Sequence, residues 1–409
     1  MSFMSTSEPI LKTPFFDCAA ELNTKQRWVA WDCFFIADVF SDMHREYRAI
    51  RESAAAIDMS PLSKFDIVGP DSKAFINYLV TRDLSNQQVG QILYTPWCNP
   101  EGKLVNDGVI FKHSEDHFRI SCDPQLLWLS QNASFFDVNV VDVSLDFGIL
   151  SIQGPKSRQK LEQSLGQSLS GLKFSRFHQI TVNGLEILVM RQGFTGELGY
   201  ELWVKAADGG ALWEILFEGD SSHDNLLPAG FYSHDVARME AGLIIPGPDY
   251  TGAGTYNDRG AASPVLEMDI RSPFETGLHR FVHFDKTEFI GKAALLNEWQ
   301  SGNFRRMKGL VIDWSDVASV QAKMGLQPVC VPHPIWIPLD ITMHGKKIGR
   351  ATSITWSPAI GNIAGFAFLD EKFAISGQNV TIEMPFDDEF FAVRGKVVDI
   401  PFVKPSRGN

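Results

Sequence analysis

The sequence predicts an α+β protein that ends in a β-rich domain, and three observations support this prediction. A strand, a Gly-Pro turn and a helix follow one another twice, at Gly69-Pro70 and again at Gly154-Pro155. This repetition indicates two related α+β halves. Apolar residues at spacings of three and four mark further helices in the first part of the chain. From about residue 305, short segments punctuated by Gly, Pro and Asn are typical of a small β-sandwich or barrel.

Each element can be placed along the chain. Residues 36–57 are predicted to form one helix, because their apolar side chains recur every three or four positions. After the first Gly-Pro turn, Asp71 or Ser72 can cap the next helix. A second strong helix is predicted within residues 222–243.

Chain length indicates more than one domain, since 409 residues exceed one ordinary hydrophobic core. We expect an α+β region over residues 1–285 that contains two related lobes, a linker over 286–305, and a β-barrel domain over 306–409. Apolar residues make up 44% of the chain and charged residues 21%, which is a globular composition.

Charge and hydropathy exclude several classes of partner. The net charge is −12 and no basic run is present, which disfavours nucleic acid and anionic membranes as partners. No apolar run reaches the roughly 18 residues of a membrane span, and the N-terminus lacks a signal-peptide pattern. We therefore expect a cytoplasmic protein that binds neither nucleic acid nor membrane.

Cysteine and histidine spacing gives no metal signature. The cysteines are scattered and lack a CxxC pair, which predicts reduced thiols rather than disulfides or zinc. His279 and His283 are four apart, but HRFVHF alternates like a strand, so a helical metal pair is not expected. We expect no metal.

The stretch GFTGELGYEL, which begins at Gly193, combines three glycines with two carboxylates, Glu197 and Glu201. Gly193 and Gly196 permit positive φ or a close backbone approach. The turn is either an ordinary hairpin or the side of a site for a flat ligand. In the second case Glu201 or Glu197 could accept two parallel N–H hydrogen bonds from a heterocycle edge.

A second candidate stretch is LYTPWCNPEGKLVNDGVIFK. It places Tyr94, Asn106 and Asp107 around a Pro-Glu-Gly turn between two predicted strands. An acidic residue inside a strand is unfavourable unless it is exposed or functional. Asp107 is therefore either a solvent-facing residue or part of a site.

Five motifs, in order along nearly the whole chain, resemble those of the glycine-cleavage T-protein family. GFTGELGYE is similar to the GYTGExGxE signature, and NPEGKLVNDGVIFK to the NExGGxxDD strand pair. LPAGFYSHDVARMEAGL, the stretch containing FIGKAALL, and IGRATSITWSPAIGNIAGFAFL resemble the family's later motifs. The resemblance implies a three-lobed α+β ring around tetrahydrofolate, followed by a C-terminal β-barrel.

The resemblance also implies site residues. Asp107 matches the acid at the reactive edge of the folate, Glu201 the acid that binds the pterin, and Tyr94 a tyrosine of the site. Phe194 replaces the tyrosine of the signature and lacks its hydroxyl. Asn106 and Asp123 complete the folate-binding set that we expect.

Several departures from the family pattern concern the substrate. His234 replaces an arginine that serves the folate, Arg280 stands at a tryptophan, and IPGPDYTGAG replaces the usual YGNDID. The N-terminal region looks more like the dimethylsulfoniopropionate demethylase and aromatic O-demethylase branches. We therefore expect a small-molecule methyl donor and no lipoyl carrier protein.

These expectations lead to one main hypothesis and two alternatives. The main hypothesis is a tetrahydrofolate-dependent O-demethylase of a methoxylated aromatic acid, which moves the methyl group to N5 and releases a phenol. The alternatives are an S- or N-demethylase of a small sulfonium or methylamine, and a non-catalytic folate-binding protein. Candidates to assist the leaving group are Tyr250, Tyr232, His234 and Arg280. The expected catalytic residues are Asp107, Tyr250 and His234. Expected substrate contacts are Trp28, Trp31, Arg280 and Tyr232, although tyrosines and aromatic clusters are more often core residues.

Overall fold

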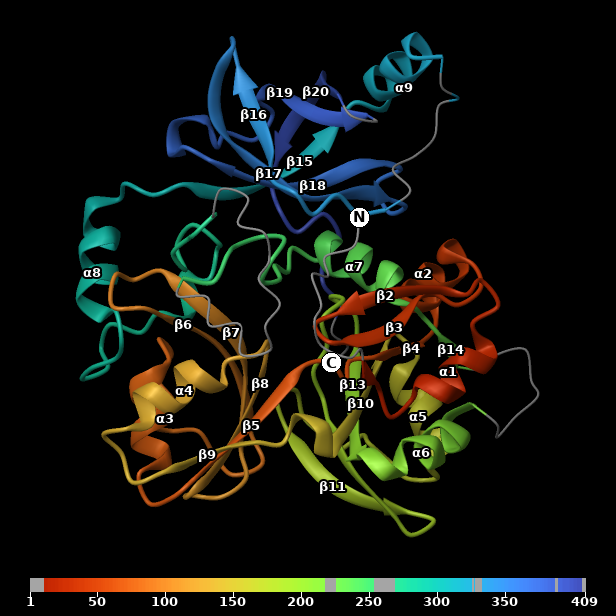
Figure 1. The fold of residues 1–409 in the computed structure, drawn as a ribbon, viewed down its shortest axis with the longest axis vertical. Helices are drawn as coiled ribbons and strands as arrows, with labels where there is room; N and C mark the ends of the chain where they lie inside the picture. Colours follow the sequence, from red (N-terminus) through yellow and green to blue (C-terminus); the bar gives the residue numbers. More distant parts are fainter. Residues whose placement is uncertain are drawn as a thin grey trace.

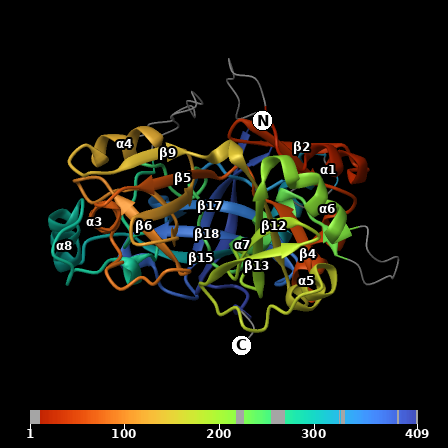
Figure 2. The ribbon, with the colours of Figure 1, turned by 90° about the horizontal axis from the view of Figure 1, so that it is seen from below.

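A computed structural model describes residues 11–217, 226–253, 269–325, 327, 333–386 and 389–406 of the protein. Three bodies meet around the helix α7 (Phe231–Glu240): a barrel and two α+β lobes that lie side by side (Figures 1 and 2). No helix of the described residues is long and apolar enough to cross a membrane.

The first lobe is built on a five-stranded sheet of order β6-β7-β8-β5-β9. Its core lies between this sheet and the helices α3 and α4, and includes Phe65, Trp97 and Ile120. The elements of this lobe are β5 (Ser63–Val68), α3 (Ser72–Leu79), β6 (Ile92–Cys98), β7 (Leu104–Lys112), β8 (His117–Cys122), α4 (Leu126–Ala133) and β9 (Asn139–Asp142).

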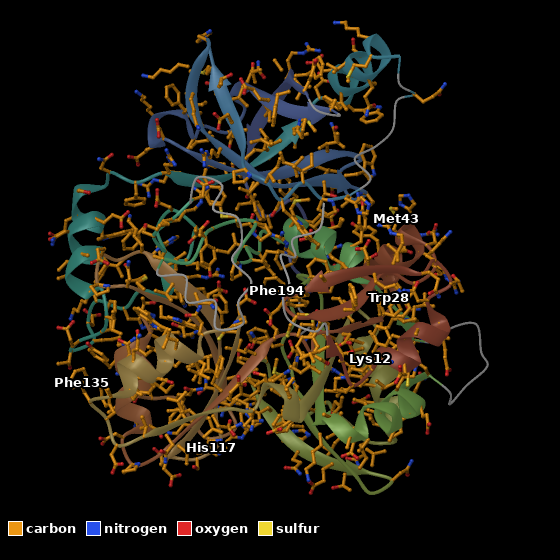
Figure 3. The ribbon with its side chains drawn as sticks, viewed as in Figure 1. Lys12, Trp28, Met43, His117, Phe135 and Phe194 are labelled. Carbon is orange, nitrogen blue, oxygen red and sulfur yellow. The ribbon has the colours of Figure 1, made fainter. Side chains whose placement is uncertain are left out.

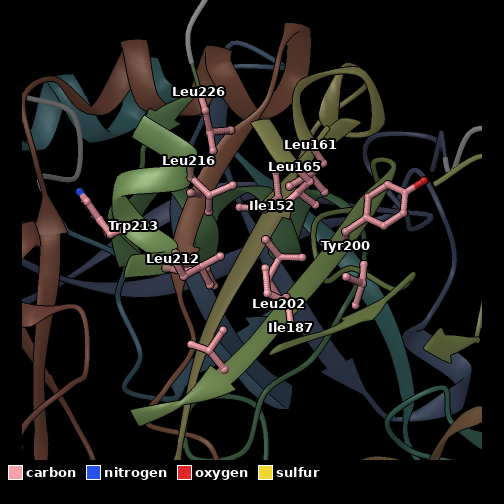
Figure 4. Close-up of a cluster of buried hydrophobic side chains, with 14 of the residues drawn as sticks. Ile152, Leu161, Leu165, Ile187, Tyr200, Leu202, Leu212, Trp213, Leu216 and Leu226 are labelled. Carbon is pink, nitrogen blue, oxygen red and sulfur yellow. The ribbon is translucent and has the colours of Figure 1, made fainter. Parts of the chain in front are cut away.

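The second lobe is built on a six-stranded sheet of order β11-β12-β13-β10-β4-β14. Leu202 and Ile187 on its strands pack against Leu212 and Leu216 of α6 (Figure 4). Its elements are β4 (Ala55–Asp58), η1 (Ser144–Asp146), β10 (Phe147–Gln153), α5 (Ser157–Leu165), β11 (Phe177–Val182), β12 (Leu185–Met190), β13 (Gly199–Lys205), η2 (Ala206–Asp208), α6 (Gly209–Phe217) and β14 (Leu227–Pro228).

The predicted duplication is present in the structure. In each lobe a strand ends at a glycine of positive φ, 148° at Gly69 and 137° at Gly154, and a helix starts three residues later. A Cβ atom would come within 2.3 Å of the Asp137 carbonyl oxygen at Gly69, and within 2.4 Å of the Ser53 carbonyl oxygen at Gly154. Three antiparallel strands follow each helix, and the third of them returns to pair with the first strand of the repeat.

The prediction of a single helix over residues 36–57 is wrong. The segment contains β3 (Phe34–Val39), α2 (Met43–Glu52) and β4. β3 ends at Val39, and Asp42 caps the start of α2, because its side chain accepts a hydrogen bond from the Arg45 amide. The alanines of β4 are buried between β10 and β14, so pairing in the sheet overrides their helix propensity.

An N-terminal sheet of order β1-β3-β2 packs beside the second lobe (Figure 1). Phe15 from this region is fully buried in the second-lobe core, and a Cβ atom on Gly148 would meet its ring at 2.9 Å. The additional elements are β1 (Leu11–Lys12), α1 (Phe16–Leu22) and β2 (Arg27–Trp31).

The helix predicted within residues 222–243 is α7, which is shorter than expected. Residues 222–225 lie outside the described residues, and β14 precedes the helix. Gly230 is the N-cap and lies so close to Asp38 that an added Cβ atom would be 2.0 Å from its carbonyl oxygen. Every residue from Tyr232 to Glu240 is buried, because α7 is enclosed by the lobes and the barrel.

The C-terminal part forms the predicted barrel, which is closed and has the strand order β15-β18-β17-β16-β19-β20. The HRFVHF segment does not form a strand, since His279–Phe281 is a short 3₁₀ helix, η3. The remaining elements are α8 (Lys292–Ser301), β15 (Arg306–Ile312), α9 (Trp314–Lys323), β16 (Leu339–Met343), β17 (Lys346–Ser357), β18 (Asn362–Leu369), η4 (Glu371–Phe373), β19 (Asn379–Phe386) and β20 (Glu389–Val398).

Candidate active site

A buried carboxylate shared by two tyrosines defines the candidate active site. Asp107 lies on β7, between β6 and β8, with 8% of its surface exposed. Tyr94 on β6 donates a 2.8 Å hydrogen bond to Asp107 Oδ2, and Tyr250 donates a short one to Oδ1. Tyr250 follows α7 in the sequence, so residues 143 positions apart meet at one carboxylate.

Burial controls the proton affinities of this group. It raises the pKa of Asp107 to about 6, although the hydrogen bonds from Tyr250 and Tyr94 act in the opposite direction. Burial and the negative charge of Asp107 raise the pKa of both tyrosines well above the usual range. Asp107 can therefore gain or lose a proton near neutral pH, while both phenols hold theirs.

Asn106 and Asp123 lie beside Asp107, and their expected role in folate binding stays a prediction. The side chain of Asn106 accepts a hydrogen bond from the Asp107 amide and donates a longer one, 3.4 Å, to the Asp123 carbonyl. Burial raises the pKa of Asp123 to about 7, and the negative charges of Asp107 and Asp32 add to this rise. Asp32 is a residue that sequence reasoning missed. It is in the β2–β3 turn with a φ of 52°, and only the fold brings this turn to the site.

The other predicted acid, Glu201, lies on β13 of the second lobe. One oxygen of its carboxyl accepts a 3.1 Å hydrogen bond from Trp203 Nε1. Burial raises the pKa of Glu201 to about 7, against the effect of the Trp203 hydrogen bond. Glu197 is different, because it forms a 2.9 Å ion pair with Arg51, which also pairs with the buried Glu240. Of the two carboxylates in the glycine-rich stretch, Glu197 is held in an ion pair and Glu201 accepts the Trp203 hydrogen bond. That Glu201 binds a ligand stays a prediction.

The glycines of this stretch have contacts within the protein that explain them. A Cβ atom at Gly193 or Gly199 would come within 2.2 or 2.4 Å of the Gln153 side chain. Gly196 has a φ of 81°, and its added Cβ atom would lie 2.9 Å from that of Ala241. The glycines thus allow the turn to pack closely against β10 and the end of α7. Whether they also face a ligand stays a prediction.

Phe194 lies at the centre of the molecule (Figure 3) and belongs with His234 to a row of rings. The His234 ring lies 5.7 Å from Phe194 and 6.3 Å from Phe231, and Phe231 lies 5.3 Å from Trp31. Burial, helped by the charge of Arg238, lowers the pKa of His234 to about 3. Its imidazole is therefore neutral, and its buried Nε2 has no hydrogen-bond partner in the part of the chain that the structure describes.

Trp28 and Tyr232 occupy other places. Trp28 stacks on Phe16 at 4.6 Å and lines a small cavity near Trp213, away from the centre marked by Phe194 (Figure 3). Tyr232 packs in a buried cluster with Val39 and Val236. The structure records no contact of either residue with Asp107 or Glu201, and their role in substrate binding stays a prediction.

The segment that carries Tyr250 is anchored to the barrel by its neighbour Asp249. The Asp249 carboxylate is fully buried and accepts hydrogen bonds of 2.6 Å from Arg238, Thr352 and Ser353. This network joins α7, the following turn and β17, so it positions the Tyr250 ring. Sequence reasoning missed Arg238 and Thr352, since neither has a local signal of its role.

Comparison with known proteins agrees with this architecture. Residues 17–265 match the GCVT N-terminal domain, and residues 320–404 match the glycine cleavage T-protein C-terminal barrel domain. An aminomethyltransferase of Bacillus cereus (strain AH187) is 30% identical over 97% of this chain and 99% of its own length. An aminomethyltransferase of Thermoanaerobacter sp. (strain X514) is 30% identical over 91% of this chain and 92% of its own.

The chain belongs to the glycine cleavage T-protein family. The fold agrees with that of the glycine cleavage system aminomethyltransferase T from Bartonella henselae, with a TM-score of 0.79 over 97% of this chain and 99% of that one, at 20% identity. The α+β T-protein fold with its closed C-terminal barrel, expected from the sequence, is thereby confirmed. The relatives carry the name of an aminomethyltransferase, not of a demethylase.

Proposed function

We propose that this T-protein family member is a tetrahydrofolate-dependent demethylase that moves the methyl group of a methoxylated aromatic acid to N5 of tetrahydrofolate. The products are 5-methyltetrahydrofolate and a phenol. The observation that carries the proposal is the Asp107 carboxylate with its two tyrosine hydroxyls, because it joins a proton acceptor to a phenolic proton donor.

The acids of the two lobes suit a folate. Asp107 is buried and Glu201 half-buried, burial raises the pKa of both carboxyls, and both suit pairing with the N–H groups of a heterocycle. Among the described residues, Trp203 is the one side chain that donates a hydrogen bond to the Glu201 carboxylate. The carboxylate can therefore accept further hydrogen bonds from a ligand. When bound, tetrahydrofolate supplies the secondary amine that accepts the methyl group.

The Asp107–Tyr250 pair can balance the protons of an ether demethylation. The carbon–oxygen bond of the methoxy group breaks as the bond from the methyl carbon to nitrogen forms. Asp107 takes the proton that the methylated amine loses, and Tyr250 gives its own to the departing oxygen. The hydrogen bond between them returns a proton from Asp107 to Tyr250, so no further reactant is required.

A neutral imidazole in place of the family's arginine supports a small-molecule donor. His234 is buried among Phe194 and Phe231, and its lowered pKa keeps it uncharged. This wall suits an aromatic ring better than a charged group. We therefore propose that no lipoyl carrier protein takes part. Aminomethyl transfer, the reaction in the relatives' name, is the main competing activity.

One observation favours a second candidate, the demethylation of a sulfonium or methylammonium compound. The negative charges of Asp107 and Asp32 both raise the pKa of Asp123, and a cationic donor bound beside these acids would relieve their repulsion. A sulfonium leaves as a neutral thioether and needs no proton from Tyr250.

The test is incubation of the protein with tetrahydrofolate and a panel of methoxybenzoates, sulfonium acids, N-methyl compounds and an aminomethylated carrier protein. We expect 5-methyltetrahydrofolate and a phenol from at least one methoxybenzoate, and no ammonia from the carrier. Ammonia release from the carrier would replace this proposal with aminomethyl transfer. Folate binding without turnover of any donor would point to a non-catalytic folate-binding protein.

A further inference from the structure

Two arginines meet next to the candidate active site. The guanidinium carbon of Arg280 lies 4.8 Å from the centre of the Phe281 ring, and that of Arg82 lies 5.4 Å from it. The same ring packs edge-on against Tyr94, at 5.0 Å. Arg82 also donates a 2.8 Å hydrogen bond from Nη1 to the Tyr94 carbonyl. Both cations are therefore linked through one ring to the tyrosine that binds Asp107.

Neither guanidinium forms an ion pair with a carboxylate in the described ranges, whereas the buried arginines Arg51, Arg119 and Arg238 all do. The nearest acid in sequence, Asp83, accepts instead from the Ser85 amide. Burial and the neighbouring positive charge of Arg280 lower the pKa of Arg82, as expected for two like charges close together. The Phe281 ring offsets only part of this cost.

We propose that Arg82 and Arg280 form a carboxylate-binding site beside Tyr94. Two guanidiniums that have no carboxylate partner among the described residues lie next to one aromatic ring and offer forked N–H donors, which match the geometry of a carboxylate. Arg280 is exposed and Arg82 half-buried, so a ligand can reach them from solvent. A carboxylate there would remove the repulsion between the two cations and tie the ligand to the Asp107 site.

This inference rests on the proposed function in one respect, since both proposed ligands carry the required group. An aromatic acid has its ring carboxylate, and tetrahydrofolate has the two carboxylates of its glutamate. The chemistry of recognition is the same in both cases. The source of the carboxylate is decided by experiment.

The experiment compares Arg82→Gln and Arg280→Gln with the parent by titration calorimetry on two ligand pairs. Tetrahydrofolate is paired with 6-methyltetrahydropterin, which lacks the benzoylglutamate tail, and 3-methoxybenzoate is paired with its neutral amide. Arg48→Gln is the control, because Arg48 is an exposed arginine of α2, outside this cluster. Binding needs no turnover, so the result does not depend on whether demethylation occurs.

We expect each variant to bind one of the carboxylated ligands roughly 10- to 100-fold more weakly, which is the range for the loss of a hydrogen bond to a charged group. The neutral member of that pair should change by less than about twofold. A loss confined to tetrahydrofolate assigns the site to the folate tail, and a loss confined to methoxybenzoate assigns it to the donor. Equal losses for the charged and neutral members, or no loss, would overturn the site. Arg280→Gln keeps the test valid if Arg82→Gln does not fold, because Arg280 makes no hydrogen bond in the described structure.

Discussion

The two α+β lobes share the same strand-to-helix turn, but the acidic residue of each lobe has different neighbours. Each lobe turns from strand to helix at a glycine of positive φ and then returns by three antiparallel strands. The acid of the first lobe, Asp107, accepts hydrogen bonds from two hydroxyls, one of them supplied by the turn after α7. The acid of the second lobe, Glu201, accepts one from an indole, which cannot release a proton at ordinary pH.

This difference indicates a division of roles. A carboxylate bound to phenols can exchange protons with them, whereas one bound to an indole can only accept hydrogen bonds. We infer that the first lobe carries the chemistry and the second lobe holds the ligand. The duplicated scaffold is the same in both lobes, so the side chains of neighbouring segments determine the distinction.

The largest expected effect comes from removing the phenolic proton. Tyr250→Phe should lower kcat by roughly 10²–10⁴, the usual range for general acid catalysis, while the buried ring keeps its place. The loss should shrink for donors whose phenols are more acidic, which steady-state rates on chlorinated methoxybenzoates would measure. Tyr78→Phe, on α3 beside Phe136, is the matched control. An unchanged mutant-to-parent ratio across the series would remove Tyr250 as the acid.

Asp107→Asn should lower kcat by about 10² with a smaller change in KM, because the amide can no longer take a proton. The pKa of Asp107 is about 6 and the carboxylate is the active form, so parent activity should fall as pH drops through 6. The variant should lose this limb of the pH–rate profile. An identical acidic limb in the variant would assign it to another group.

Glu201→Gln should weaken tetrahydrofolate binding by about 1.5–3 kcal/mol and leave kcat at saturation nearly unchanged. Glu197→Gln, four residues earlier, is the matched control. It removes a partner of Arg51 and should lower thermal stability without changing the folate affinity. Calorimetry that shows equal folate affinity in Glu201→Gln and the parent would contradict the division of roles between the lobes.

The smallest expected effect concerns the strand-to-helix glycine turn that the two lobes share. Gly69→Ala and Gly154→Ala should each destabilise the protein by about 1–3 kcal/mol, since each added methyl group meets a carbonyl oxygen at a positive φ. Gly171→Ala is the control, because its Cβ atom meets nothing within 4 Å. Denaturation midpoints should fall for the first two variants alone. A shift at only one of them would show that the repeats are not equivalent.

Much of the fold could be predicted from local signals. The Gly-Pro turns at Gly69 and Gly154 and the strand texture after residue 305 led to the duplicated lobes and the barrel, because steric limits on φ and alternation act over a few residues. The helix predicted over residues 36–57 failed for the opposite reason. Sheet pairing of β3 with β1 and β2, and of β4 with the distant strands β10 and β14, outweighed a local helical pattern.

By itself, the sequence determined the T-protein fold and the candidate acids Asp107 and Glu201, because ordered motifs carry that information without coordinates. Only the tertiary structure decided which groups surround these and neighbouring residues. Tyr250 donates a hydrogen bond to Asp107, and Arg51 forms an ion pair with Glu197. Arg82 and Arg280 both lie over the Phe281 ring. Asp107 and Tyr250 are 143 residues apart, and no local spacing predicts such a contact. Hydrogen bonds and pKa shifts depend on distance and burial in space, which the chain sets only when it folds.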